Sequence, residues 1–108
     1  MARFLLIESH DPFATDDGGH FCGLAASLAR AANQVTLFLT QAGVLPARAG
    51  EHTFWFAALA RVGVEVLADG RSLRERGMAG APLSPGVRPS GAETLVDRLA
   101  EGRQTIWH

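Results

Sequence analysis

The sequence predicts an α/β protein built on a mostly parallel sheet of about five strands. Short apolar runs at residues 3–8, 34–40 and 64–68 alternate with segments of helical periodicity. A strand, a helix and a strand within about 40 residues form a βαβ unit, in which both strands run parallel. With 108 residues, 47% of them apolar, the chain can build one core, so we expect a single domain over residues 1–108.

The composition narrows the classes of function. The net charge of −1 lacks the positive excess that is typical of nucleic-acid-binding proteins. No apolar run approaches the roughly 18 residues of a membrane span. The amino-terminal apolar run is too brief for a secretory signal, so we expect a cytoplasmic protein. Lysine is absent, which excludes Schiff-base chemistry, and no glycine-rich segment has the spacing of a nucleotide fingerprint. We therefore expect no cofactor and no nucleic-acid or membrane partner.

The first part of the chain reads as a strand, a helix and a second strand. Residues 3–8 contain a continuous apolar run, as expected for a strand covered on both faces. Apolar residues at helical spacing predict a helix over residues 19–32, which Asp16 or Asp17 could cap. Residues 34–40 are the second strand.

A second helix, predicted over residues 49–62, carries three consecutive aromatic residues, Phe54, Trp55 and Phe56. At 100° per residue they cover about 200° of the helix surface, which is wider than contact with one core requires. We therefore expect a subunit interface on this helix. The alternative is that one aromatic ring lies on the domain's own surface.

The apolar run at residues 64–68 leads into Asp69, and a short helix is expected from Gly70 to a stop at Gly77. This junction lies at the carboxyl edge of the sheet, where ligands and reactive side chains collect in parallel α/β folds. Asp69, followed by Gly70 and Arg71, is therefore the leading candidate for a functional site. The alternative role of Asp69 is the N-cap of the helix, which aspartate fills well.

The last part of the chain begins with a connection rich in glycine and proline, residues 78–89, with room for a short strand around Val87. Ser90 and Glu93 have the spacing of a capping box, so we expect a helix to begin there. Residues 104–107 are predicted to form a final strand.

Several short sequence segments match a known family: residues 4–7, 21–29, 35–39, 43–44, 73–78 and 90–91. In these segments and in the order of its elements, the chain resembles the DsrE/DsrF/DsrH family, which includes the TusD-like sulfur-relay subunits. The resemblance implies a three-layer α/β/α domain that assembles as a trimer or hexamer, or pairs with related DsrE-like subunits. It also implies a sulfur-carrier protein as a partner.

The chain departs from this family at the residue that carries sulfur. Active members have a cysteine eight residues before the glycine that closes a Leu-Arg-Arg-Gly-like word, and counting back from Gly77 gives Asp69. A cysteine there would have its thiolate stabilised by the amides and dipole of the helix start. Aspartate keeps the negative charge but cannot hold a transferable sulfur, so this chain is not expected to carry persulfide at the usual position.

Cys22 is the single cysteine, so any persulfide chemistry would have to use it. A small cysteine at the margin of an apolar helix stripe is commonly a core residue. If the helix begins near Gly19, however, Cys22 lies in its first turns, where the dipole could help to activate the thiol. Both interpretations remain open at this stage.

His10 and Asp11 follow the first strand. The first strand of a doubly wound sheet often neighbours the third, so we expect both side chains to face Asp69 across the carboxyl edge. A histidine and carboxylates could bind a metal or shuttle a proton. They could equally just end the strand and cap the turn, and we assign no metal site from the sequence.

These observations favour an accessory protein or subunit of sulfur trafficking that is not itself an enzyme. The second interpretation is a small-molecule or anion-binding module with Asp69, His10 and Asp11 at the strand edge. The third is an enzyme that uses Asp69 and His10. If the chain is catalytic, the resemblance implies sulfurtransferase-like chemistry at Asp69 or Cys22.

Overall fold

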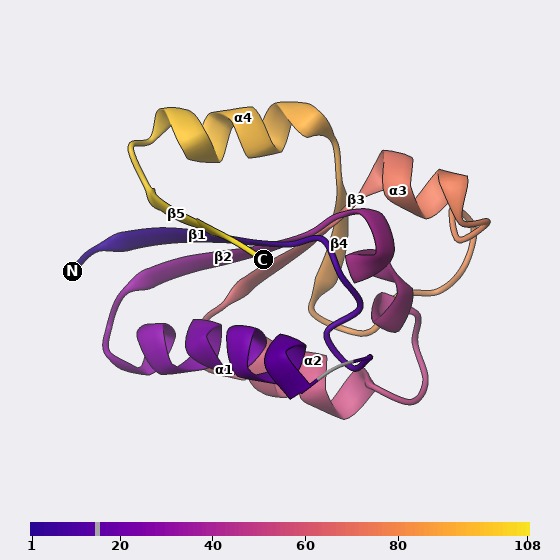
Figure 1. Ribbon diagram of the computed structural model, residues 1–108, viewed down its shortest axis with the longest axis horizontal. Helices are drawn as coiled ribbons and strands as arrows, with labels where there is room; N and C mark the ends of the chain where they lie inside the picture. The colour runs from indigo at the N-terminus through magenta and orange to yellow at the C-terminus, as the bar shows by residue number, and fades with distance from the viewer. Residues whose placement is uncertain (15) are drawn as a thin grey trace.

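The computed structural model describes residues 1–14 and 16–108, with the backbone alone for residues 16–18. Its sheet has five parallel strands in the order β4-β3-β2-β1-β5. The strands are β1 (Arg3–Glu8), β2 (Gln34–Leu39), β3 (Glu65–Asp69), β4 (Val87–Ser90) and β5 (Gln104–Trp107). Helices cover both faces (Figure 1), which confirms the predicted three-layer α/β/α architecture.

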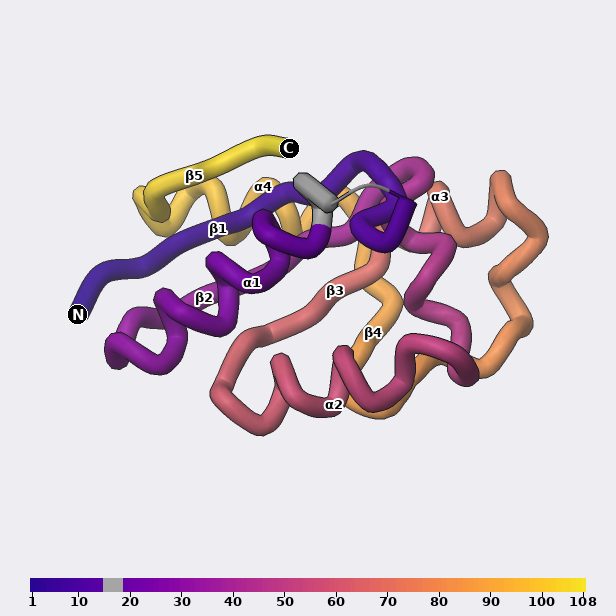
Figure 2. The backbone as a smooth tube through the Cα atoms, turned by 60° about the horizontal axis from the view of Figure 1, so that its bottom comes forward, coloured from indigo at the N-terminus to yellow at the C-terminus, as the bar shows by residue number. Residues whose placement is uncertain are grey.

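The two faces of the sheet are covered unequally. The helical elements are α1 (Asp16–Arg30), the 3-10 helix η1 (Gln41–Ala47), α2 (Thr53–Arg61), α3 (Gly70–Glu75) and α4 (Ala92–Ala100). Figure 2 shows α1 and α2 on the same face of the sheet, while α4 lies across the other in Figure 1. The larger core cluster lies under α1, η1, α2 and α3, and a small one of four strand residues packs against Leu95 of α4. No residue of α4 is fully buried.

The central strands are buried on both faces because most of their residues are apolar. In β1, Leu6 belongs to the larger cluster, whereas Leu5 and Ile7 belong to the smaller one. This alternation is the pleat of a strand whose neighbours cover both sides. The continuous apolar run predicted for this strand is therefore confirmed.

The 3-10 helix η1 was not predicted from the sequence. It begins at Gln41, whose φ of 51° turns the chain sharply after β2, and whose amide donates to Oγ of Ser72 at 2.8 Å. Gly43 then lies directly against the backbone carbonyl of Glu8, where a Cβ atom would find no room. The turn therefore depends on close backbone approach and on a side chain from α3, neither of which local periodicity reveals.

The predicted capping box is wrong: Ser90 is the last residue of β4, paired with Asp69, and the N-cap of α4 is Gly91, which makes no side-chain capping bond. The strand predicted around Val87 thus extends through Ser90. The predicted capping by Asp16 or Asp17 falls on side chains outside the described part of the chain.

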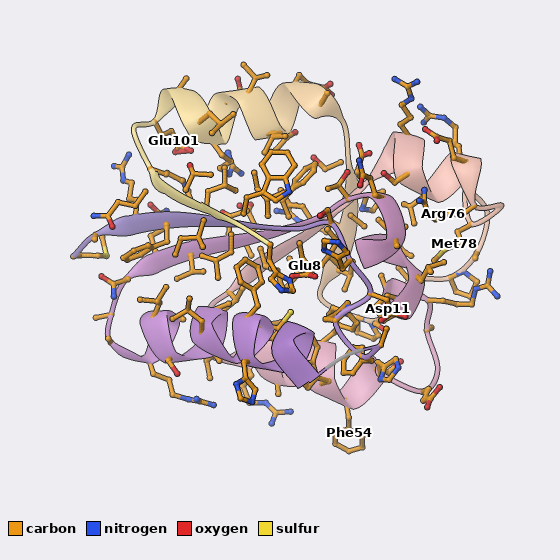
Figure 3. The ribbon with its side chains drawn as sticks, viewed as in Figure 1. Glu8, Asp11, Phe54, Arg76, Met78 and Glu101 are labelled. Carbon is orange, nitrogen blue, oxygen red and sulfur yellow. The ribbon has the colours of Figure 1, made fainter. Side chains whose placement is uncertain are left out.

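The three aromatic residues of α2 point in different directions, as their spacing predicts. Phe56 is fully buried in the core, and Trp55 is half-buried with its ring edge-on to Phe56 and to Phe13. Phe54 is 89% exposed and projects away from the molecule (Figure 3).

Among the described residues, no helix has the length and apolar character to cross a membrane.

Candidate functional site

Asp69 caps α3 at the carboxyl end of β3. Its carboxylate accepts from the backbone amide of Ser72 at 3.2 Å and from the Ser72 hydroxyl at 2.6 Å, and Oγ1 of Thr40 lies 3.5 Å away. The Ser72 hydroxyl also accepts from the amide of Gln41. The predicted capping role is therefore confirmed, and Asp69 joins the ends of β2 and β3 to the start of α3.

Asp69 also lines an open cavity of about 620 Å³. Gly70, Arg71 and Arg74 also line this cavity. The remaining lining comes from β2, β4, α4 and the residues next to them: Phe38, Thr40, Pro89, Ser90, Gly91, Ala92, Glu93 and Leu95. The cavity lining thus combines apolar residues with one capped carboxylate, a glutamate and two arginines. Arg71 forms an exposed ion pair with Glu75, its Nε lying 3.0 Å from Oε1.

The expectation that His10 and Asp11 face Asp69 is wrong. β2 lies between β1 and β3, so the carboxyl ends of the first and third strands are two strand spacings apart, roughly 10 Å. Neither residue lines the Asp69 cavity. Asp11 instead borders a second hollow, of about 280 Å³, with Arg48 and His52.

His10 belongs to a different group, which sequence analysis missed. Glu8, the last residue of β1, lies beside His108, the residue that follows β5, and the donor atoms of Glu8, His10 and His108 lie within 4.8 Å of one another. Nδ1 of His108 is 2.8 Å from one carboxylate oxygen of Glu8 and 3.0 Å from the other. Figure 3 shows Glu8 at the carboxyl end of β1. The one sequence feature that pointed to this group was Glu8, a charged residue at the end of an apolar run.

The electrostatics of this group follow from burial. The side chain of Glu8 has no solvent exposure, and its burial raises the pKa of the carboxyl, an effect that the hydrogen bond and charge of His108 partly offset. His108 is about one-third exposed, and His10 is exposed. The group therefore has a buried carboxyl end and an accessible histidine end.

Cys22 is a fully buried core residue of α1. Burial, and secondarily the charge of Glu8, raise the pKa of its thiol to about 12. The helix starts at Asp16, so Cys22 lies almost two turns in, beyond the reach of the terminal dipole. The structure thus favours the core interpretation and gives no support to an activated thiol.

Comparison with known proteins agrees with this architecture. The family model described as "DsrE/DsrF-like family" matches residues 2–107. The crystal structure of the ychN protein from E. coli aligns with a TM-score of 0.89 at 17% identity, and the MTH1491 protein of unknown function from Methanobacterium thermoautotrophicum with a TM-score of 0.76 at 23%. Each alignment covers 100% of both chains. No curated protein matches the chain.

Proposed function

The chain belongs to the DsrE/DsrF-like family, and from this premise we propose that it is an accessory protein or subunit of sulfur trafficking that does not itself carry persulfide at the usual position. One observation carries the proposal: Asp69, already held by Ser72 as a helix cap, stands where active members have cysteine. A carboxylate engaged in this way preserves the local fold and the negative charge without a sulfur acceptor.

The state of Cys22 supports the same conclusion. A thiol whose pKa is about 12 is a thiolate in only about one molecule in 10⁵ at pH 7, and the thiolate is the nucleophile in sulfur transfer. Its side chain is also closed off from any partner protein by complete burial. A persulfide formed on this residue would therefore need the domain to open.

A protein without a sulfur-accepting residue acts through its partners. We infer assembly as a homotrimer or homohexamer, or pairing with related DsrE-like subunits that contribute the cysteine, and contact with a sulfur-carrier protein in the cytoplasm. The exposed ring of Phe54 on α2 supports a subunit contact, because a phenylalanine that is 89% exposed gains most by burial against another chain.

The decisive experiment is mass spectrometry of the native protein after exposure to a persulfide donor. We expect no added sulfur on the wild-type chain. The double variant Asp69→Cys, Cys22→Ala should acquire one reducible sulfur atom, because its thiol would occupy the helix start. The single variant Cys22→Ala is the matched control. Sulfur added to Cys22 in the native wild type, and passed on to an acceptor thiol, would contradict the proposal.

The second candidate is an anion- or small-molecule-binding module at the Asp69 cavity. The observation in its favour is the cavity itself, with Arg71 and Arg74 on its wall. Calorimetric titration with thiosulfate tests it: binding that the variant Arg74→Gln weakens would support this role, and no heat of binding would argue against it. The enzyme hypothesis that joins Asp69 to His10 is not retained, because β2 separates the two sites.

A further inference from the structure

Two strands that are neighbours in the sheet bring together a carboxylate and two imidazoles. β1 and β5 run parallel with Ile7 opposite Trp107, so the next residues, Glu8 and His108, meet at the carboxyl edge. The backbone fixes this meeting, since His108 donates to the carbonyl of Ile7 at 2.8 Å and accepts from the amide of Ser9 at 2.9 Å. His10 follows two residues after the end of β1.

From this geometry we propose that Glu8, His10 and His108 form a binding site for a divalent transition-metal ion such as Zn²⁺. Two histidine nitrogens and one carboxylate oxygen are a common ligand set for zinc and for non-haem iron. Donor atoms around Zn²⁺, at about 2.0–2.2 Å from the ion, lie roughly 3–4 Å apart. The three donor atoms here already lie within 4.8 Å of one another, so small side-chain rotations suffice to take up an ion.

The charge distribution favours a cation at this place. Glu8 is buried without exposure, and a buried carboxylate is costly unless a positive charge or hydrogen bonds compensate it. Its partners in the described part of the chain are the His108 ring and the backbone amide of His10, at 3.3 Å. A divalent ion would take the place of the proton between His108 and Glu8, and that proton would leave to solvent.

The two imidazole rings are held in position by their surroundings. The ring of Phe21 stacks on His108 with centroids 5.0 Å apart, and His10 meets His108 edge-on at 5.6 Å. The Ser9 hydroxyl donates to the carbonyl of His108 at 2.8 Å. Because these contacts already restrict the rings, the rings lose less conformational entropy when an ion binds.

The site is open on one side. His10 is exposed and His108 is partly so, while Glu8 closes the inner end. Three protein ligands leave a fourth position for water or an exogenous ligand, which is the arrangement of a reactive zinc site and not of a closed structural one. The proposal does not depend on Asp69 or on the sulfur-trafficking role.

The test is a titration of the untagged, chelator-treated protein with Zn²⁺ in competition with a chromophoric chelator, repeated with Co²⁺ to follow visible absorption. We expect one ion per chain. The variant His10→Ala should weaken binding by about tenfold or more, since even outer-shell losses cost 10–100-fold at metal sites. The variants His108→Ala and Glu8→Gln should weaken it further. His20→Ala, which removes an exposed histidine of α1, is the matched control and should bind as the wild type does.

Because Glu8 is buried, Glu8→Gln could fail to fold. The Zn²⁺ affinity of His10→Ala then tests the proposal, since the exposed side chain of His10 contributes little to folding. Circular dichroism confirms that each variant is folded. An equal Zn²⁺ affinity for the wild type, His10→Ala and His108→Ala would overturn the proposal, as would a wild-type chain that takes up no ion.

Discussion

Arg98 of α4 donates two hydrogen bonds to the carboxylate of Glu65 at the start of β3, from Nε to Oε1 and from Nη2 to Oε2, both at 2.9 Å. Thr36 and Arg88 donate to the same carboxylate at 2.6 and 2.8 Å. The Arg98 hydrogen bond above all lowers the pKa of Glu65 to about 2. This bidentate pair anchors a helix that has no fully buried residue of its own.

The first prediction concerns the removal of this charge. Glu65→Gln should lower the free energy of unfolding by on the order of 2–3 kcal/mol at pH 7, since one pKa unit corresponds to about 1.4 kcal/mol. A lowered pKa gives stability that is present above about pH 4.5 and is lost as the pH falls towards 2. Urea denaturation at pH 7 and pH 2.5 should therefore show the difference between variant and wild type shrinking in acid.

The control for this prediction is Glu75→Gln, which breaks the exposed pair with Arg71 and should change stability by less than about 0.5 kcal/mol. A Glu65→Gln protein as stable as the wild type at pH 7 would show that α4 does not depend on the ion pair.

The second prediction concerns the cap of α3. Asp69→Ala removes the acceptor for the amide and hydroxyl of Ser72, so it should destabilise the protein by about 1 kcal/mol. Asp69→Asn keeps an oxygen acceptor and should stay within a few tenths of a kcal/mol of the wild type. Denaturant midpoints measure both. Equal stability of the alanine and asparagine variants would contradict a capping role.

The third prediction concerns the thiol of Cys22. Because its pKa is about 12 and its side chain is buried, a disulfide reagent at pH 8 should label the native protein only as fast as the domain opens. In denaturing urea the same thiol should react at once, which provides the internal control. Rapid labelling of the folded protein would show an accessible thiolate and would weaken the proposed function.

The fourth prediction compares two glycines. In Gly43→Ala the new Cβ would meet the backbone carbonyl of Glu8, so we expect a loss of more than about 2 kcal/mol from overpacking. Gly23, exposed on α1, has no atom within 4 Å of an added Cβ, so Gly23→Ala should stabilise the helix by about 0.5–1 kcal/mol. Thermal or urea unfolding separates the two outcomes, and similar effects in both variants would refute the contact argument.

The fifth prediction concerns assembly. If the wild type assembles as proposed, Phe54→Asp should shift it towards smaller species in sedimentation velocity, because a charge would replace the exposed ring at the proposed contact. Val96→Asp is the matched control, since Val96 is also exposed but lies on α4, across the sheet. A wild-type chain that sediments as a monomer would remove the proposed interface.

Much of the fold could be predicted because it follows from local patterns. The β1 run and the β3–α3 junction at Asp69 have strong periodicity and turn chemistry, and the structure confirms both. The order of strands could not be derived in this way, since it depends on packing between segments distant in the sequence. Placing the first strand beside the third therefore led to the wrong partner for His10.

The second group of polar residues escaped detection for a related reason. Glu8 and His108 are 100 positions apart, and only the register of β1 with β5 brings them together. The start of α4 shows the local counterpart: Ser90 fits a capping pattern, but its pairing with Asp69 keeps it in β4. In both cases the pairing of two strands determined where the residue lies. Strand pairing cannot be predicted from a short segment of a single sequence.

The position of β5 has a consequence for how the molecule assembles. Among the described residues it pairs with β1 alone, through residues 100 positions away, and all four of its side chains are exposed. Pairing of strands so far apart in sequence is slow, because the entropy of a long loop is lost. The pairing buries little surface in compensation until the rest of the sheet has formed. We therefore expect β5 to dock last in folding and to detach first in native-state fluctuations, so that the environment of Glu8 is the most transient part of an otherwise early-formed sheet.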